Sequence, residues 1–168
     1  MAEREPAPLG DLPHRIAMPR DLVDLASPDP DLIPAKVALL TYFAHYANMI
    51  AVSDFGGKAG EVRGEGLVEQ VVGAAFQTFG DFDPYPDPFD KAAMLLRGIT
   101  QGHPFADGNK RTGFVVASYW LEHVGFPTPE TLDRNAVYDF CRQVSAGEIR
   151  DIGEMAEVLL RFWGLPPA

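Results

Sequence analysis

The feature that most constrains this chain is the spacing of its apolar side chains, which recur every three or four residues over segments of helical length. Alternation with a period of two, which a half-buried strand would show, never persists for long. The sequence therefore predicts an all-α fold with at most one short hairpin. The segments expected to be helical are residues 35–52, 67–79, 88–102, 110–123, 128–146 and 151–163.

Residues typical of helix ends mark several of these boundaries. Asp87 followed by Pro88 predicts a helix start, because aspartate accepts free backbone N–H groups and proline suits the first turn. Further starts are expected at Thr128 and at Asp151, which precedes Glu154 in a capping-box pattern.

Proline separates the N-terminal segment from the rest of the chain. Close prolines prevent a long helix, so residues 1–34 are expected to form a proline-rich arm, and residues 35–168 a single domain with its own core. The prolines of the arm are Pro6, Pro8, Pro13, Pro19, Pro28, Pro30 and Pro34.

Charge and composition exclude several classes of protein. The net charge of -10 argues against binding to nucleic acid, which depends on Lys and Arg at phosphates. No apolar run is long enough to span a membrane, and the acidic N-terminus is unlike a signal peptide, so a cytoplasmic protein is expected. The single cysteine, Cys141, lies among apolar residues and is expected to be buried.

The connection between segments 88–102 and 110–123 is unusually rich in reactive groups. Taken singly, a histidine after a helix or an Asp-Gly-Asn turn is ordinary loop chemistry. Together they are not, because a plain connector has no need of a base, a carboxylate, a flexible glycine and two cations in a row. The residues concerned are His103, Asp107, Gly108, Lys110 and Arg111.

Each group has a role that suits a nucleotide. Gly108 permits close backbone approach before a helix whose free N–H groups attract anions, and Lys110 and Arg111 add positive charge for a polyphosphate. Asp107 is the candidate ligand for Mg²⁺, which usually takes one or two carboxylates plus phosphate oxygens. His103 is the candidate general base.

The remaining residues offer no competing site. Phe105 is expected to point into the core and hold the loop between its helices. His14, His45 and His123 have no metal-ligand spacing with Cys, Asp or Glu, and no phosphate-loop or nucleophile-elbow pattern occurs.

The nine residues from His103 to Arg111, His-Pro-Phe-Ala-Asp-Gly-Asn-Lys-Arg, resemble the motif of the Fic/Doc family, His-x-Phe-x-Asp/Glu-Gly/Ala-Asn-Gly/Lys-Arg. Shorter stretches on both sides are similar to the death-on-curing branch, so the resemblance covers residues 62–163. It implies a Fic-type helical bundle with ATP as substrate and Mg²⁺ as cofactor. Within that fold, His103 would be the base, Asp107 would bind Mg²⁺, and the nucleotide-binding segment would contain Phe105, Gly108, Asn109, Lys110, Arg111 and Thr112.

Two neighbouring residues point to different reactions. Lys110 replaces the glycine of the adenylylating branch, and in Doc-like enzymes that share this lysine the implied reaction moves the γ-phosphate of ATP to a protein hydroxyl, with elongation factor Tu as the known target. Gly108 matches the adenylylating motif, so transfer of AMP remains an alternative. The third hypothesis is a regulator that binds a nucleotide without catalysing a reaction.

The glycine-rich segment 56–66 lies where the family has its flap, a short β-hairpin that aligns a target peptide by strand addition. Val62, Arg63 and Gly64 are the expected docking residues, and an ordinary surface loop is the alternative. The chain lacks the family's inhibitory pattern, Ser/Thr-x-x-x-Glu-Gly/Asn, so the resemblance implies that a separate antitoxin chain inhibits it.

Overall fold

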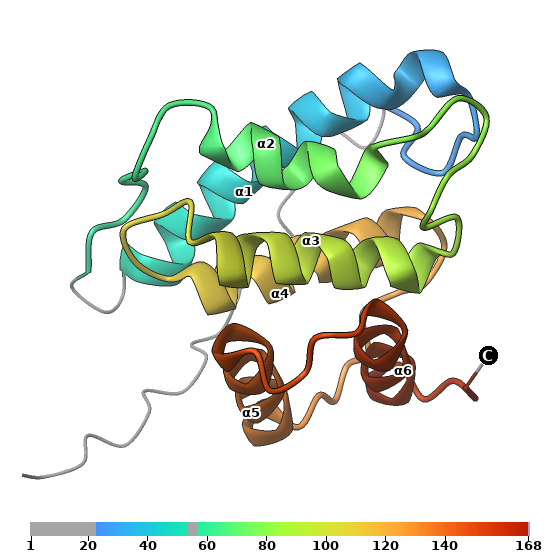
Figure 1. The fold of residues 1–168 in the computed structure, drawn as a ribbon. Coiled ribbons are helices and arrows are strands. Elements are labelled where there is room, and N and C mark those ends of the chain that lie inside the picture. Colours follow the sequence, from blue (N-terminus) through green and yellow to red (C-terminus); the bar gives the residue numbers. More distant parts are fainter. Residues whose placement is uncertain (1–22, 54–56, 168) are drawn as a thin grey trace, which may run out of the picture.

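The computed structural model describes residues 23–53 and 57–167, so most of the expected N-terminal arm lies outside the described residues. Within these ranges every regular element is helical, and strand pairing is limited to isolated bridges, which confirms the all-α prediction. The elements are η1 (Pro30–Leu32), α1 (Ile33–Ser53), α2 (Leu67–Gly73), η2 (Ala74–Phe76), α3 (Pro88–Gly102), α4 (Asn109–His123), α5 (Arg134–Ala146) and α6 (Ile152–Phe162), drawn in Figure 1.

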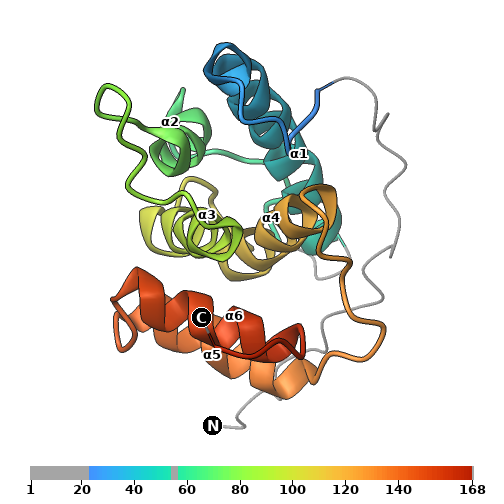
Figure 2. The same cartoon turned by 90° about the vertical axis from the view of Figure 1, so that its right-hand side faces the viewer.

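The helices form three layers, with α3 and α4 in the middle. In both views α1 and α2 cover one side of this central pair and α5 and α6 the other (Figures 1 and 2). Helix α3 contacts α2, α4, α5 and α6, so it is the centre of the core. None of the described helices is long and apolar enough to cross a membrane.

Small residues bring α3 and α4 close together. Ala92 and Ala93 of α3 are fully buried, and Gly113 of α4 packs directly on α3. A Cβ atom at Gly113 would lie 3.0 Å from the Leu96 carbonyl oxygen and 3.0 Å from Cγ2 of Thr100. The expectation that the helix after the loop is buried is therefore confirmed, since nearly all of its apolar side chains are buried.

Two of the three predicted capping sites are confirmed. The carboxylates of Asp87 and Asp151 accept the N–H groups of Phe89 and Glu154 at 2.7 Å and 3.0 Å. The predicted start at Thr128 is wrong. Helix α5 begins at Arg134, because the carboxylate of Asp133 accepts two backbone N–H groups of its first turn and leaves residues 126–133 irregular.

The hairpin flap expected in segment 56–66 is not shown. Its first residue lies outside the described ranges, and residues 57–66 form turns with one antiparallel bridge, between Val62 and Phe105. The expectation for Cys141 is confirmed, because this residue of α5 is buried and its burial raises the pKa of the thiol to about 12. The thiol is therefore protonated and unreactive at neutral pH.

The packing at Gly113 predicts that substitutions of two helical glycines differ sharply in their effect on the free energy of unfolding. We expect Gly113→Val to lower the free energy of unfolding by about 1–3 kcal/mol, because added atoms would press on the α3 backbone. Gly73→Ala is the matched control: its Cβ would meet only Val37 Cγ1, at an ordinary 3.9 Å, and alanine favours helix. Urea denaturation of both variants measures the difference, and equal stability would contradict the assignment of Gly113 as a packing constraint.

Candidate active site

The reactive loop joins the C-terminus of α3 to the N-terminus of α4, and left-handed residues bracket it. His103 ends α3 with φ 46° and ψ 50°, and it is the one non-glycine residue with positive φ in the described ranges. Gly108 precedes α4 with φ 75°. Such a backbone is strained for histidine, costing about 1–2 kcal/mol, and strain of this kind often occurs at functional sites.

Asn109 closes the loop on itself. Its carboxamide oxygen accepts the N–H of Phe105 at 3.0 Å, and its NH₂ group donates to the Phe105 carbonyl at 2.9 Å. The Phe105 ring is fully buried and meets His45 of α1 edge-on, with ring centroids 5.5 Å apart. The loop is thus pinned to the core as expected, and its polar groups are held in fixed places.

Gly108 is required by its neighbours as well as by its backbone angles. A Cβ atom there would lie 2.3 Å from Cγ2 of Val52 and 3.1 Å from Nδ2 of Asn48, both on α1. Helix α4 begins at the next residue, and the N–H groups of its first turn have no partner within the helix. This end of α4 has the form of an anion-binding site.

Asp107 presents an exposed carboxylate at this helix end. Oδ1 accepts the N–H of Gly108 at 2.6 Å, and a Cβ on Gly57 would lie 2.3 Å from Oδ2, so the segment after residue 56 passes directly over this side chain. The described residues contain no group of three or more His, Cys, Asp or Glu side chains that could hold a metal ion. Asp107 therefore fits Mg²⁺ only as one ligand beside phosphate oxygens, which is the usual arrangement for this ion.

Arg63 and Lys110 place positive charge near His103, and a further cation, Arg111, follows Lys110 on α4. Lys110 is exposed on the first turn of α4, and Arg111, half-buried, donates from Nη1 to the Ala51 carbonyl of α1 at 3.0 Å. Desolvation, followed by the charges of Arg63 and Lys110, lowers the pKa of His103 from its ordinary value. The imidazole is therefore mainly neutral at pH 7, the form that can accept a proton.

The predicted docking residues lie beside this loop. The N–H of Arg63 donates to the Pro104 carbonyl at 2.8 Å, and the N–H of Ala106 donates to the Glu61 carbonyl at 2.8 Å, so one strand-like contact joins the two segments. Val62 and Arg63 are exposed and Gly64 is half-buried.

Two predicted site residues lie beneath the exposed face of the loop. Phe105 and Thr112 are fully buried, so they support the loop from below. The hydroxyl of Thr112 accepts a hydrogen bond from Nδ2 of Asn48 at 3.1 Å. Sequence reasoning missed Asn48, although a polar residue between Ala47 and Ala51 on the buried side of a helix is itself a signal.

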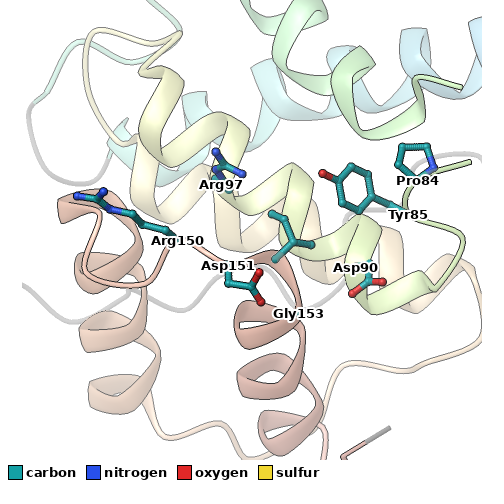
Figure 3. A pocket seen from close by; sticks show the side chains of 8 residues that line it. Pro84, Tyr85, Asp90, Arg97, Arg150, Asp151 and Gly153 are labelled. Carbon is teal, nitrogen blue, oxygen red and sulfur yellow. The ribbon is translucent and has the colours of Figure 1, made fainter. Parts of the chain in front are cut away.

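A depression lies elsewhere on the molecule. It has a volume of about 400 Å³ between α3 and α6, and none of the predicted site residues lines it. Figure 3 shows Arg97 and Arg150 at one end of this groove and Asp90 at the other. The reactive loop and the groove are thus separate features.

The left-handed backbone of His103 predicts an unusual order of stability. We expect the free energy of unfolding of His103→Gly to exceed that of His103→Ala by about 1 kcal/mol, because only glycine adopts this conformation without strain. Urea denaturation of the two variants measures the difference. At the exposed helical position Ala38, by contrast, Ala→Gly should cost about 1 kcal/mol. If His103→Ala is as stable as His103→Gly, the backbone at position 103 is not strained and the prediction is wrong.

The charges around His103 predict its titration. By NMR, the imidazole pKa should lie below about 6.5, its usual value, and Arg63→Gln should raise it. Lys58→Gln is the control, since Lys58 pairs with Glu61 at 3.5 Å and does not act on His103. The unfolded chain binds this proton more readily, so the stability present above about pH 6.5 is lost progressively as pH falls from there through the lowered pKa of the folded state. A pKa at or above about 6.5 would contradict the geometry.

Comparison with known proteins gives the arrangement a context. The profile of the Fic/DOC family matches residues 41–121, which include the C-terminal part of α1 and the whole loop. A protein of Mycolicibacterium smegmatis named Toxin Doc is 32% identical over 108 residues, which is 64% of this chain and 82% of that protein. A protein of Escherichia phage P1 named Protein kinase doc is 29% identical over 120 residues, 71% of this chain and 88% of that protein.

A third relative, a Fido domain-containing protein of Dictyostelium discoideum, is 35% identical over 65 residues, 38% of this chain and 46% of that protein. The loop geometry, the family profile and these relatives agree. The chain belongs to the Fic/Doc family, in its death-on-curing branch.

Proposed function

We propose that this protein transfers the γ-phosphate of ATP to a hydroxyl group of a target protein, with Mg²⁺ as cofactor. The observation that carries the proposal is Lys110, which stands exposed on the first turn of α4 and acts electrostatically on His103. A cation there adds to the anion-binding helix end and suits a terminal phosphate beside the base.

The described groups divide the reaction among them. His103, neutral at pH 7, takes the proton of the attacking hydroxyl. The hydroxyl oxygen forms a bond to the γ-phosphorus as the bond between that phosphorus and the β,γ-bridging oxygen breaks, and ADP leaves. The N–H groups of the first turn of α4, together with Lys110 and Arg111, hold the phosphates. Mg²⁺, when bound through Asp107 and the phosphates, neutralises their charge.

Transfer of AMP is the competing reaction, and its motivation is Gly108. Packing supplies another reason for this glycine, because Val52 of α1 occupies the space that an alanine Cβ would need. Gly108 therefore carries less weight in choosing the reaction, while no contact in the described residues demands a lysine at position 110. This asymmetry favours phosphate transfer.

The biological role is inferred from relatives. Two of them carry the names Toxin Doc and Protein kinase doc, which supports a toxin that modifies a protein. As its target we propose a translation factor, such as elongation factor Tu. A separate antitoxin chain would inhibit it, and both chains would act in the cytoplasm. Arg63 and its neighbours would dock the target segment beside the loop.

ATP labelled at the γ- or the α-phosphate distinguishes the reactions. With cell lysate as substrate, we expect label from γ-labelled ATP, and none from α-labelled ATP, on a protein. His103→Ala should reduce the rate by about 10²–10⁴-fold, the usual contribution of a general base. Asp107→Asn should also reduce it, whereas Asp90→Asn, which removes a carboxylate in the groove away from the loop, should not.

The opposite labelling pattern assigns the chain to AMP transfer. Transfer of neither label, with growth inhibition unchanged by His103→Ala, would instead support the non-catalytic, nucleotide-binding alternative.

A further inference from the structure

Asn48 lies on α1, outside the motif, and connects four parts of the structure. Its side chain is fully buried. Nδ2 donates to the Asp107 carbonyl at 2.8 Å and to the Thr112 hydroxyl at 3.1 Å, and Oδ1 accepts the N–H of Gly60 at 2.8 Å. One carboxamide thus joins α1, the reactive loop, α4 and the segment that precedes Arg63.

The network is costly to disturb because it is buried. Both hydrogens of the Asn48 amide and its oxygen are used, and Ala44, Ala47, Ala51 and Val52 around it on α1 are buried apolar residues. A buried polar group that loses its partner costs about 1–3 kcal/mol, so such networks specify one arrangement.

The arrangement that it specifies concerns Asp107. Asn48, on α1, donates a hydrogen bond to the Asp107 carbonyl. Asn48 also accepts the N–H of Gly60, three residues after Gly57. The backbone of Gly57 passes so close to the Asp107 carboxylate that a Cβ on Gly57 would lie 2.3 Å from Oδ2. Both the backbone of Asp107 and the segment that confines its side chain are therefore fixed by the same amide.

We propose that Asn48 is a positioning residue that aligns the Asp107 carboxylate for Mg²⁺ bound with a nucleotide. The inference rests on the proposed function, since it assumes that the site takes Mg²⁺ and ATP. It extends the site to a residue of α1 that contacts neither. Groups that orient a metal ligand typically change metal affinity by 10–100-fold when they are replaced.

The test measures binding, so it does not depend on turnover. In the full-length His103→Ala protein, ATP binding is followed by calorimetry as Mg²⁺ is increased. We expect Asn48→Asp, which keeps an acceptor for Gly60 but loses both donors, to raise the Mg²⁺ concentration at half-maximal binding about tenfold. Asn48→Ser, which is smaller and uncharged, should shift it in the same direction and covers the case in which the buried charge prevents folding.

A matched control separates positioning from general destabilisation. Lys36 is the other buried polar residue on α1, and it donates to the Ser27 carbonyl far from the loop. Lys36→Met should lower stability and leave the Mg²⁺ dependence unchanged. A folded Asn48 variant with the Mg²⁺ dependence of the parent protein would overturn the inference.

The two proposals fail in different ways. If ATP binds without any response to Mg²⁺, the inference about Asn48 is overturned even where phosphate transfer is observed. If the labelling assay shows transfer of AMP, phosphate transfer is rejected, and the shift in Mg²⁺ dependence still supports Asn48.

Discussion

The close packing of α3 on α4 is the constraint on which the rest of this structure depends. Gly113 lies against the α3 backbone, so the two helix axes are brought together along a seam of small residues. The chain must then reverse direction within the few residues between Gly102 and Asn109. It does so with left-handed residues at both ends of the loop, His103 and Gly108, and with Asn109 bonded back to Phe105.

This tight reversal also creates the electrostatic character of the site. The chain carries a net charge of -10, yet Arg63, Lys110 and Arg111 gather around one helix N-terminus. Desolvation, followed by the charges of Arg63 and Lys110, lowers the pKa of the histidine that this loop holds. An imidazole that is neutral at physiological pH is thus a consequence of where the helices place it.

Features encoded locally could be predicted from the sequence. The bounds of α3 and the caps at Asp87 and Asp151 follow from short-range preferences, and the reactive loop was recognisable as a group of residues. Thr128 shows the limit of such rules, because a better cap, Asp133, lies five residues further on. The buried contact between Asn48 and Thr112 spans 64 positions along the chain, a partnership that only the packing of α1 on α4 creates.

The contact between Val52 and Gly108 bears on how motifs in this family are interpreted. The two residues are 56 positions apart in the sequence (108 − 52 = 56), yet the side chain of Val52 fills the place that a Cβ on Gly108 would need. An alanine at position 108 of this fold would therefore require a smaller or displaced side chain at position 52. The residue at a motif position can therefore reflect the packing of a neighbouring helix as much as the chemistry of the site.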